Sequence, residues 1–366
     1  MSQTANSLTG LALQKFKKNF WGVLSLCYIV LCGMIALFAY LIAPDNSQNA
    51  NQMHLSIHSR GPGFTTTMLT IPSTIEEESF AFSSLFFGKR NNDTEIPITA
   101  HTIEGNTIIY TPYAGDDIKG IPKRLEMEEG VDVYAFAKAH IASQKFMLGT
   151  DKYGRDLLSR MFVGARISFS IGFVAVFISL LIGLFMGSLA GYFGGKVDAV
   201  IMWVINVTWS IPTLLLVIAI TLALGKGFWQ VFIAVGLTMW VEVARVVRGQ
   251  IMGVKQMQYV TAAKALGYTH GRIIIRHILP NIMAPLIVIS AANFAGAILI
   301  ESGLSFLGIG AQPPMPSWGA MIKDHYSYII LGKPYLAVIP GLAIMLLVMA
   351  FMMVGNALRD ALDVKS

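Results

Sequence analysis

The chain has 366 residues, of which 54% are hydrophobic and 13% charged, and its formal net charge is +6. A typical soluble domain carries about 25% charged residues, so this composition excludes an ordinary soluble protein and favours one that crosses a membrane. The two cysteines, Cys27 and Cys32, do not share a helix face, and with no others in the chain a disulfide framework is excluded. We expect the excess of basic residues to face anionic lipid headgroups and partner proteins, so it calls for no nucleic-acid partner.

Charged residues are unevenly placed along the chain. Five windows of 24 to 29 residues hold none: 19–44, 167–195, 199–225, 277–300 and 334–358. Because about 20 apolar residues cross roughly 30 Å of hydrocarbon as a helix, each window is long enough to span a membrane. A sixth candidate contains Glu242 and Arg245 near one end. We therefore predict six transmembrane helices, at about 20–43, 167–192, 199–224, 228–248, 281–301 and 335–357.

The first apolar segment, 20–43, sets the orientation. It is too long for the core of a cleaved secretory signal, so we expect an anchor helix. Lysines directly before it place the N-terminal segment, 1–19, in the cytoplasm. Alternation then puts residues 245–280 inside as well, and these contain six basic residues and no acidic one. Both termini are therefore predicted to be cytoplasmic.

The one large hydrophilic segment, 44–166, holds 15 of the chain's 21 acidic residues. Alternation places it outside, where long segments cross largely regardless of charge. We predict an external insertion at 44–145 that contains a small α+β domain, followed by an interfacial helix at 146–166. The first part, 46–63, is rich in Asn, Gln, Ser and Gly and is typical of a linker.

Local patterns within the insertion predict its elements. Thr, Ile and Tyr are frequent in 64–72 and 96–113, which favours strands. Gly105 lies between two apolar runs and predicts a hairpin. Residues 131–146 have the pattern of a helix. The acidic run at 76–78 is expected to be a solvated surface.

Three ionisable residues fall within or beside the predicted spans, where charge is costly and usually functional. Glu242 and Arg245 are three residues apart and can share a helix face, so we expect an ion pair, in preference to a role in gating. Glu301 either caps the local backbone or lines a pathway. After it, the prolines in 313–316 cannot continue a helix, which predicts a turn along the outer surface with Trp318 at the membrane interface.

No catalytic or metal site is indicated. The motif G-x-x-x-x-G-K-[ST] is absent, so the chain lacks the phosphate-binding loop of an ATPase. His54 and His58 are four residues apart and could share a helix face as metal ligands. The composition around them is that of a linker, which argues against this site.

A polar, basic segment carries the most specific signal. Residues 259–280 read Y-V-T-A-A-K-A-L-G-Y-T-H-G-R-I-I-I-R-H-I-L-P. This resembles the cytoplasmic loop of ABC importer permeases, in which E-A-A is followed by G and then by I-L-P. In that family the loop forms a short coupling helix that sits in a groove on the ATPase subunit, which places the coupling loop here at 249–280. The matching positions are Tyr259, Thr261, Ala262, Ala263, Gly267, Ile278, Leu279 and Pro280.

Physical chemistry is consistent with that resemblance. The small side chains of Ala262 and Ala263 allow another protein to approach closely. Gly267 permits the positive φ that ends a short helix, and Pro280 fits the first turn of the next one. Thr261 stands where the family usually has Glu, which removes one acidic contact to the ATPase.

A second segment, 148–168, reads L-G-T-D-K-Y-G-R-D-L-L-S-R-M-F-V-G-A-R-I-S. It is similar to the signature of the C-type permease subunit of the dipeptide, oligopeptide and nickel transporter family. We expect a turn and a short interfacial helix whose arginines reach the membrane surface. The matching positions are Gly149, Thr150, Asp151, Gly154, Arg155, Asp156, Ser159, Arg160, Gly164, Ala165 and Arg166.

The resemblance covers 146–366 nearly completely and implies an all-α polytopic membrane protein of six transmembrane helices with a cytoplasmic coupling helix. Its permease domain would be 167–366. Such a chain sits in the bacterial cytoplasmic membrane with a homologous B-type permease, two ABC ATPase subunits that bind ATP and Mg, and an extracytoplasmic solute-binding protein. It binds no cofactor itself. The resemblance implies peptides as cargo, with nickel or another small solute as the alternative. A stand-alone secondary transporter and a membrane-anchored binding protein are the rivals from other classes.

Overall fold

The computed structural model describes residues 8–73, 84–89, 92–116, 118–128, 130–225 and 227–362. The predicted acidic run at 76–78 lies outside these residues. The chain forms two compact units. The first, the helical unit, comprises Met1–Gly33, Ile167–Gln312 and Gly341–Ser366, and the second, the mixed unit, comprises Met34–Arg166 and Pro313–Pro340.

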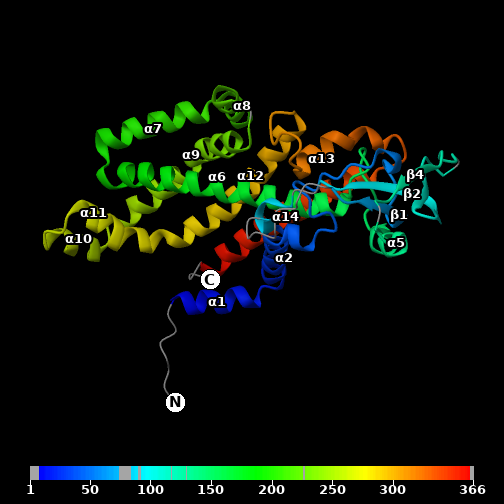
Figure 1. The fold of residues 1–366 in the computed structure, drawn as a ribbon. Helices are drawn as coiled ribbons and strands as arrows, with labels where there is room; N and C mark the ends of the chain where they lie inside the picture. The colour runs from blue at the N-terminus through cyan, green and yellow to red at the C-terminus, as the bar shows by residue number, and fades with distance from the viewer. Residues whose placement is uncertain are drawn as a thin grey trace, which may run out of the picture. The chain divides into compact units, whose positions relative to one another are not determined.

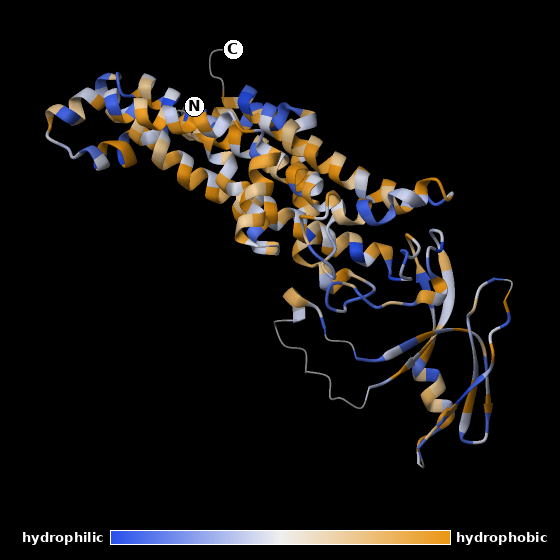
Figure 2. Cartoon of the chain, turned by 90° about the horizontal axis from the view of Figure 1, so that it is seen from above, coloured by the Kyte–Doolittle hydropathy of each residue, from blue (hydrophilic) through white to orange (hydrophobic). Residues whose placement is uncertain are grey.

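Helices dominate the fold (Figure 1). The α-helices are α1 (Leu8–Lys18), α2 (Phe20–Leu37), α3 (Ala39–Ile42), α4 (Ser84–Phe87), α5 (Val133–His140), α6 (Leu157–Phe193), α7 (Gly195–Trp209), α8 (Thr213–Leu224), α9 (Phe228–Val254), α10 (Gln258–Ala265), α11 (His270–Ile273), α12 (Met283–Phe306), α13 (Trp318–His325) and α14 (Tyr335–Leu362). Shorter 3₁₀ or π turns are η1 (Leu55–Ile57), η2 (Ile274–Ile278), η3 (Leu279–Ile282) and η4 (Tyr326–Ile329). Apolar residues cover most of the long helices (Figure 2).

Five helical segments of the described chain are long and apolar enough to cross a membrane, and the pair α7 and α8 makes a sixth if it counts as one span. A single straight helix at 199–224 was the sequence expectation, and it is wrong. The two helices meet at 92°. Pro212 has no amide hydrogen and disfavours helical geometry at Ile211, so the helix stops at Trp209 and a new one begins at Thr213.

Glycines bring α6 and α9 together in the helical unit. Gly183, Gly187 and Gly191 recur every fourth residue on α6, so they lie on one face. A Cβ atom at any of them would fall within 3 Å of α9 atoms, such as the carbonyl oxygen of Ala244 at 2.6 Å from position 187. Small residues at such a stripe let two helix backbones approach closely, as is common within membranes.

The mixed unit contains a five-stranded antiparallel sheet with the order β4-β3-β2-β1-β5. The strands are β1 (Phe64–Ile71), β2 (Thr94–Glu104), β3 (Thr107–Pro112), β4 (Lys123–Glu126) and β5 (Ile141–Phe146). Leu69, Ile98 and Tyr110 form one buried cluster, and Ile108 packs with Val133 and Ala137 of α5 in another.

Of two elements predicted for this region, the hairpin is present and the helix is shorter than expected. The predicted hairpin is confirmed, because Glu104 pairs with Thr107 across a turn in which Gly105 has a φ of 58°. The predicted helix at 131–146 is only half right. Asp132 caps α5 by accepting hydrogen bonds from two backbone amides, but from Ile141 onward the chain pairs with β1 as strand β5.

The stripe on α6 gives a prediction about stability. Gly187→Val should destabilise the helical unit by about 1–3 kcal/mol, because the added side chain must displace Val247 or the α9 backbone. Gly249→Val on α9 is the matched control, since nothing lies within 4 Å of a Cβ atom there. Thermal unfolding in detergent measures both variants. Equal midpoints for the two would contradict the close packing of α6 on α9.

Candidate functional site

The coupling segment, residues 258–282, lies in the helical unit, where Figure 1 shows α10 and α11 together at one end of the long helices. The α10 helix ends in a Schellman arrangement. The amide of Tyr268 donates to the carbonyl of Ala263 at 3.2 Å, and the amide of Gly267 donates to that of Lys264 at 3.0 Å. Gly267 has a φ of 76°, so the predicted positive φ at this residue is confirmed.

The exposed and buried faces of α10 differ from the sequence expectation at one position. Tyr259, Thr261 and Ala262 are exposed, as a docking face requires. Ala263 is buried and packs beside Val260 in the chain's own core. The small Ala263 side chain therefore lets α10 pack closely against the rest of the helical unit. The expectation that Ala263 faces a partner protein is wrong.

The ends of α6 and α9 hold the coupling segment in place. The hydroxyl of Tyr192 lies 2.9 Å from Nδ1 of His270 in α11. Lys255, at the end of α9, donates from Nζ to the carbonyl of Gly191 at 2.9 Å. Of the predicted I-L-P positions, Ile278 is fully buried, Leu279 is half-buried and Pro280 is exposed in the turn that leads into α12.

The signature segment, 149–166, lies in the mixed unit and forms a buried polar network. Asp151 is fully buried, and its carboxylate accepts hydrogen bonds from the amides of Tyr153 at 2.8 Å and Arg155 at 3.0 Å. The Arg155 guanidinium forms an ion pair with it at 2.6 Å, and Arg160 lies 3.6 Å away. Surface-reaching arginines were expected here, but Arg155 and Arg160 are each only 4% exposed.

This network begins helix α6. The carboxylate of Asp156 accepts hydrogen bonds from the amide and the hydroxyl of Ser159, at 2.8 and 2.5 Å. Burial raises the pKa of Asp156, and these hydrogen bonds oppose the shift. The helix then runs without a break from Leu157 to Phe193, so the predicted boundary at 166 between an interfacial and a membrane helix is absent.

The same segment fixes residues 46–63, which were wrongly predicted to be a linker. Thr150 accepts a hydrogen bond from the amide of Arg60 at 2.9 Å and donates to the carbonyl of Ile57 at 2.5 Å. A Cβ atom on Gly154 would fall 1.8 Å from the carbonyl oxygen of His54, so only glycine fits. Gly149 is similarly close to the backbone at Arg60.

The C-terminal part of the signature also makes contacts within the mixed unit. Trp318 is buried and donates from Nε1 to the carbonyl of Met161 at 3.0 Å, and its predicted place at the membrane interface stays a prediction. Gly164 makes room for that ring, since a Cβ atom would fall 2.8 Å from it. Ala165 is buried, and Arg166 lies over the Tyr40 ring at 5.4 Å.

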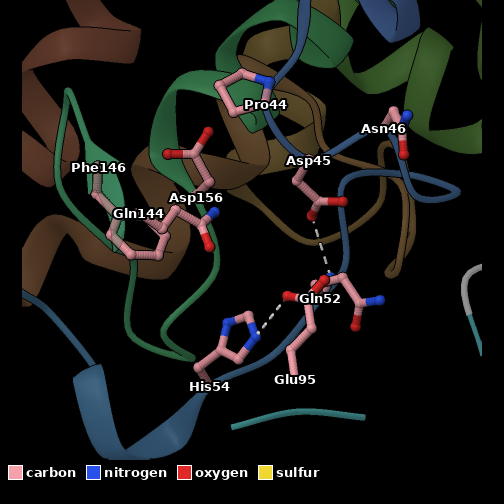
Figure 3. Close-up of a pocket in the computed structure, with 9 residues that line it drawn as sticks. All are labelled: Pro44, Asp45, Asn46, Gln52, His54, Glu95, Gln144, Phe146 and Asp156. Atoms are coloured by element: carbon pink, nitrogen blue, oxygen red, sulfur yellow. Dashed lines mark hydrogen bonds and ion pairs between the residues drawn. The ribbon is translucent and has the colours of Figure 1, made fainter. Parts of the chain in front are cut away.

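A small pocket of about 50 Å³ lies beside this network (Figure 3). Nε2 of His54 lies 3.1 Å from Oε2 of Glu95, and the Asp45 carboxylate accepts a hydrogen bond from the amide of Gln52. No group of three or more His, Cys, Asp or Glu side chains in the described residues is arranged to hold a metal ion. His54 thus joins the segment after α3 to the sheet.

One expectation about the charged residues of the helical unit, an ion pair between Glu242 and Arg245, is wrong. Arg245 does not pair with Glu242. It donates from Nη2 to Oδ1 of Asn206 at 2.9 Å and lies 3.7 Å above the Trp209 ring. Glu301 is fully buried and accepts a hydrogen bond from the Ser305 hydroxyl at 2.6 Å.

A larger pocket of about 340 Å³ lies where the bend between α7 and α8 meets α9, α12 and α14. Its lining includes Glu242, on the wall formed by α9, and Asn293, on the wall formed by α12. Sequence reasoning missed Asn293 and the bend. A proline inside an uncharged window and an amide inside an apolar run were the available signals.

Comparison with known proteins decides the family. Residues 160–365 match the model of the binding-protein-dependent transport system inner membrane component, and residues 7–58 match that of the N-terminal transmembrane domain of oligopeptide transport permease C. The chain belongs to this permease family. It is therefore a multi-pass membrane protein of the transport systems that depend on a binding protein.

Two relatives illustrate the similarity. A dipeptide transport system permease protein of Alkalihalophilus pseudofirmus is 41% identical over 61% of this chain and 73% of its own length. A glutathione transport system permease protein of Pectobacterium atrosepticum is 40% identical over 61% of this chain and 74% of its own. A solved inward-facing structure of the MetNI methionine ABC transporter is similar over 54% of this permease and 94% of that chain, with 17% identity and a TM-score of 0.45.

The geometry of α10 leads to a test of the coupling segment. Gly267→Val should weaken binding of the ATPase subunits without unfolding the membrane helices, because a β-branched residue at positive φ costs roughly 1–3 kcal/mol. Gly271→Val is the matched control, since this exposed residue lies in the same segment without a positive φ. Co-purification of the ATPase subunits measures the effect. Equal recovery with both variants would show that the end of α10 does not matter for docking.

Proposed function

We propose that the chain is a permease subunit of an ABC importer that moves short peptides across the bacterial cytoplasmic membrane. The observation that carries the proposal is α10, a short helix with an exposed face at Tyr259, Thr261 and Ala262 and a glycine end at Gly267. Dipeptide and glutathione permeases among the relatives support peptides as the cargo.

The source of energy lies outside this chain. Two partner ABC subunits bind ATP and Mg, a homologous B-type permease completes the pathway, and an extracytoplasmic binding protein delivers the peptide. Closure of the ATPase pair on ATP moves α10, which changes the side of the membrane from which the pathway is open. Such a switch requires that nucleotide binds the two states with different affinity.

The proposed topology has six spans, with α7 and α8 counted as one. Both termini and α10 are cytoplasmic, while residues 44–145 and 313–326 lie on the outer side. Support comes from the six basic residues in 245–280, where no acidic residue occurs, because basic residues accumulate in cytoplasmic loops.

Reconstitution tests the function directly. The chain, purified with its partner subunits and placed in liposomes, should take up dialanine only when both ATP and the binding protein are supplied. The reason is that the permease has no energy source of its own. Uptake that follows an ion gradient without ATP would indicate a secondary transporter, and uptake of nickel but not of dialanine would reassign the cargo.

Thiol labelling tests the topology. In a variant with Cys27→Ala and Cys32→Ala, single cysteines at Glu104 or Lys323 should react in intact cells with a membrane-impermeant maleimide. A cysteine at Lys264 should react only after the cells are opened, because α10 is proposed to face the cytoplasm. All three side chains are exposed, so access to the reagent alone decides the outcome. Labelling of the Lys264 position from outside would reverse the proposed orientation.

A further inference from the structure

The larger pocket of the helical unit has the size and chemistry of a ligand site. Its volume of about 340 Å³ lies within the range of small-molecule pockets, about 300–1,000 Å³. Most of its lining is apolar, including Ile211, Leu216, Met239 and Ile300. Gly296 contributes no side chain, and a Cβ atom there would fall 3.2 Å from the flexible end of Met239, so this glycine keeps part of the pocket open.

Asn293 places a hydrogen-bond donor at this pocket. The residue is 2% exposed, and within the part of the chain that the structure describes its Nδ2 atom has no acceptor. A buried amide donor without an acceptor destabilises the folded protein. Because buried polar groups in native proteins nearly always find a partner, a ligand oxygen is the expected acceptor.

Glu242 places a negative charge at the same pocket. Among the described residues it forms no ion pair. Arg245, the nearest cation along the helix, is held by Asn206 and Trp209. Arg248, one turn further, is paired with Asp198 at 2.5 Å. Among the residues that line the pocket, Glu242 alone carries a formal charge, so the lining is negative and favours a cationic group in a ligand.

Together these groups select a ligand that carries a cation and a hydrogen-bond acceptor a short distance apart. We propose that this pocket binds the amino-terminal end of a short peptide, with the ammonium group paired to Glu242 and a peptide oxygen accepting from Nδ2 of Asn293. The proposal rests on the proposed function as a peptide importer and adds a site on the permease itself. A lipid chain in the same place would leave both polar groups unsatisfied.

Equilibrium binding of radiolabelled dialanine to the purified permease complex, without the binding protein, tests the site. Wild type should bind dialanine saturably, and N-acetyl-dialanine, which has no ammonium group, should compete at least tenfold less well. Glu242→Gln should weaken dialanine binding about tenfold or more, since a hydrogen bond to a charged group contributes roughly 1.5–3 kcal/mol. Asn293→Leu should also weaken it severalfold, while Glu242→Asp should restore part of the affinity.

Asp360→Asn is the matched control, because it removes an exposed carboxylate from α14 outside the pocket and should leave binding unchanged. Basal ATP hydrolysis and co-purification of the partner subunits establish that each variant is folded. No saturable binding by wild type, equal competition by N-acetyl-dialanine, or wild-type affinity in Glu242→Gln would each overturn the site. ATP-driven uptake of dialanine by wild type in liposomes would leave the proposed function standing in all three cases, whereas absence of that uptake would count against the function itself.

Discussion

A polar group that is removed from water needs a hydrogen-bond or ion-pair partner. In the mixed unit, the surrounding residues are arranged to supply such partners to the carboxylate of Asp151. Asp151 is fully buried, and loss of its partners would leave an uncompensated charge at a cost of about 3–5 kcal/mol. Satisfying it requires the tight turn from Gly149 to Asp156, which brings the amides of Tyr153 and Arg155 to the carboxylate. The same turn makes hydrogen bonds to residues 46–61 and begins helix α6. The main role of the signature residues is therefore to stabilise the fold of the mixed unit.

The same rule separates two kinds of polar residue in the helical unit. Asp198 is paired with Arg248, and Arg245 contacts Asn206 and Trp209, so each of these groups has at least one partner within the chain. Glu242 and Asn293 line one pocket without such partners among the described residues. A close-packed interior tolerates unsatisfied groups mainly where a ligand or water completes them, and at this pocket a carboxylate and a buried amide without such partners line the same space.

A structural feature could be predicted from the sequence when the residues that form it lie close together along the chain. Hydropathy located most of the spans, and residues close in sequence gave the hairpin at Gly105 and the positive φ of Gly267. The break at Pro212 was also a local signal, but the length of the uncharged window outweighed it. Residues 46–63 were misjudged because their hydrogen bonds go to Thr150 and Gly154, about 90 to 100 residues away. The partner of Arg245 was missed for the same reason, since spacing along one helix cannot reveal Asn206 on another.

Helix α9 links the pocket to the coupling segment within the helical unit. It carries Glu242 at the pocket and ends beside the coupling segment at its C-cap Lys255, 13 positions further along, which corresponds to about 20 Å at 1.5 Å per residue. Helix α9 packs closely on the glycines of α6, so this pair of helices has little room to bend. Under the proposed function, a shift of α10 would move α9 as a nearly rigid rod, and Glu242 would move with it. Because coupling between two sites is reciprocal, a ligand in the proposed site would also bias the position of α10.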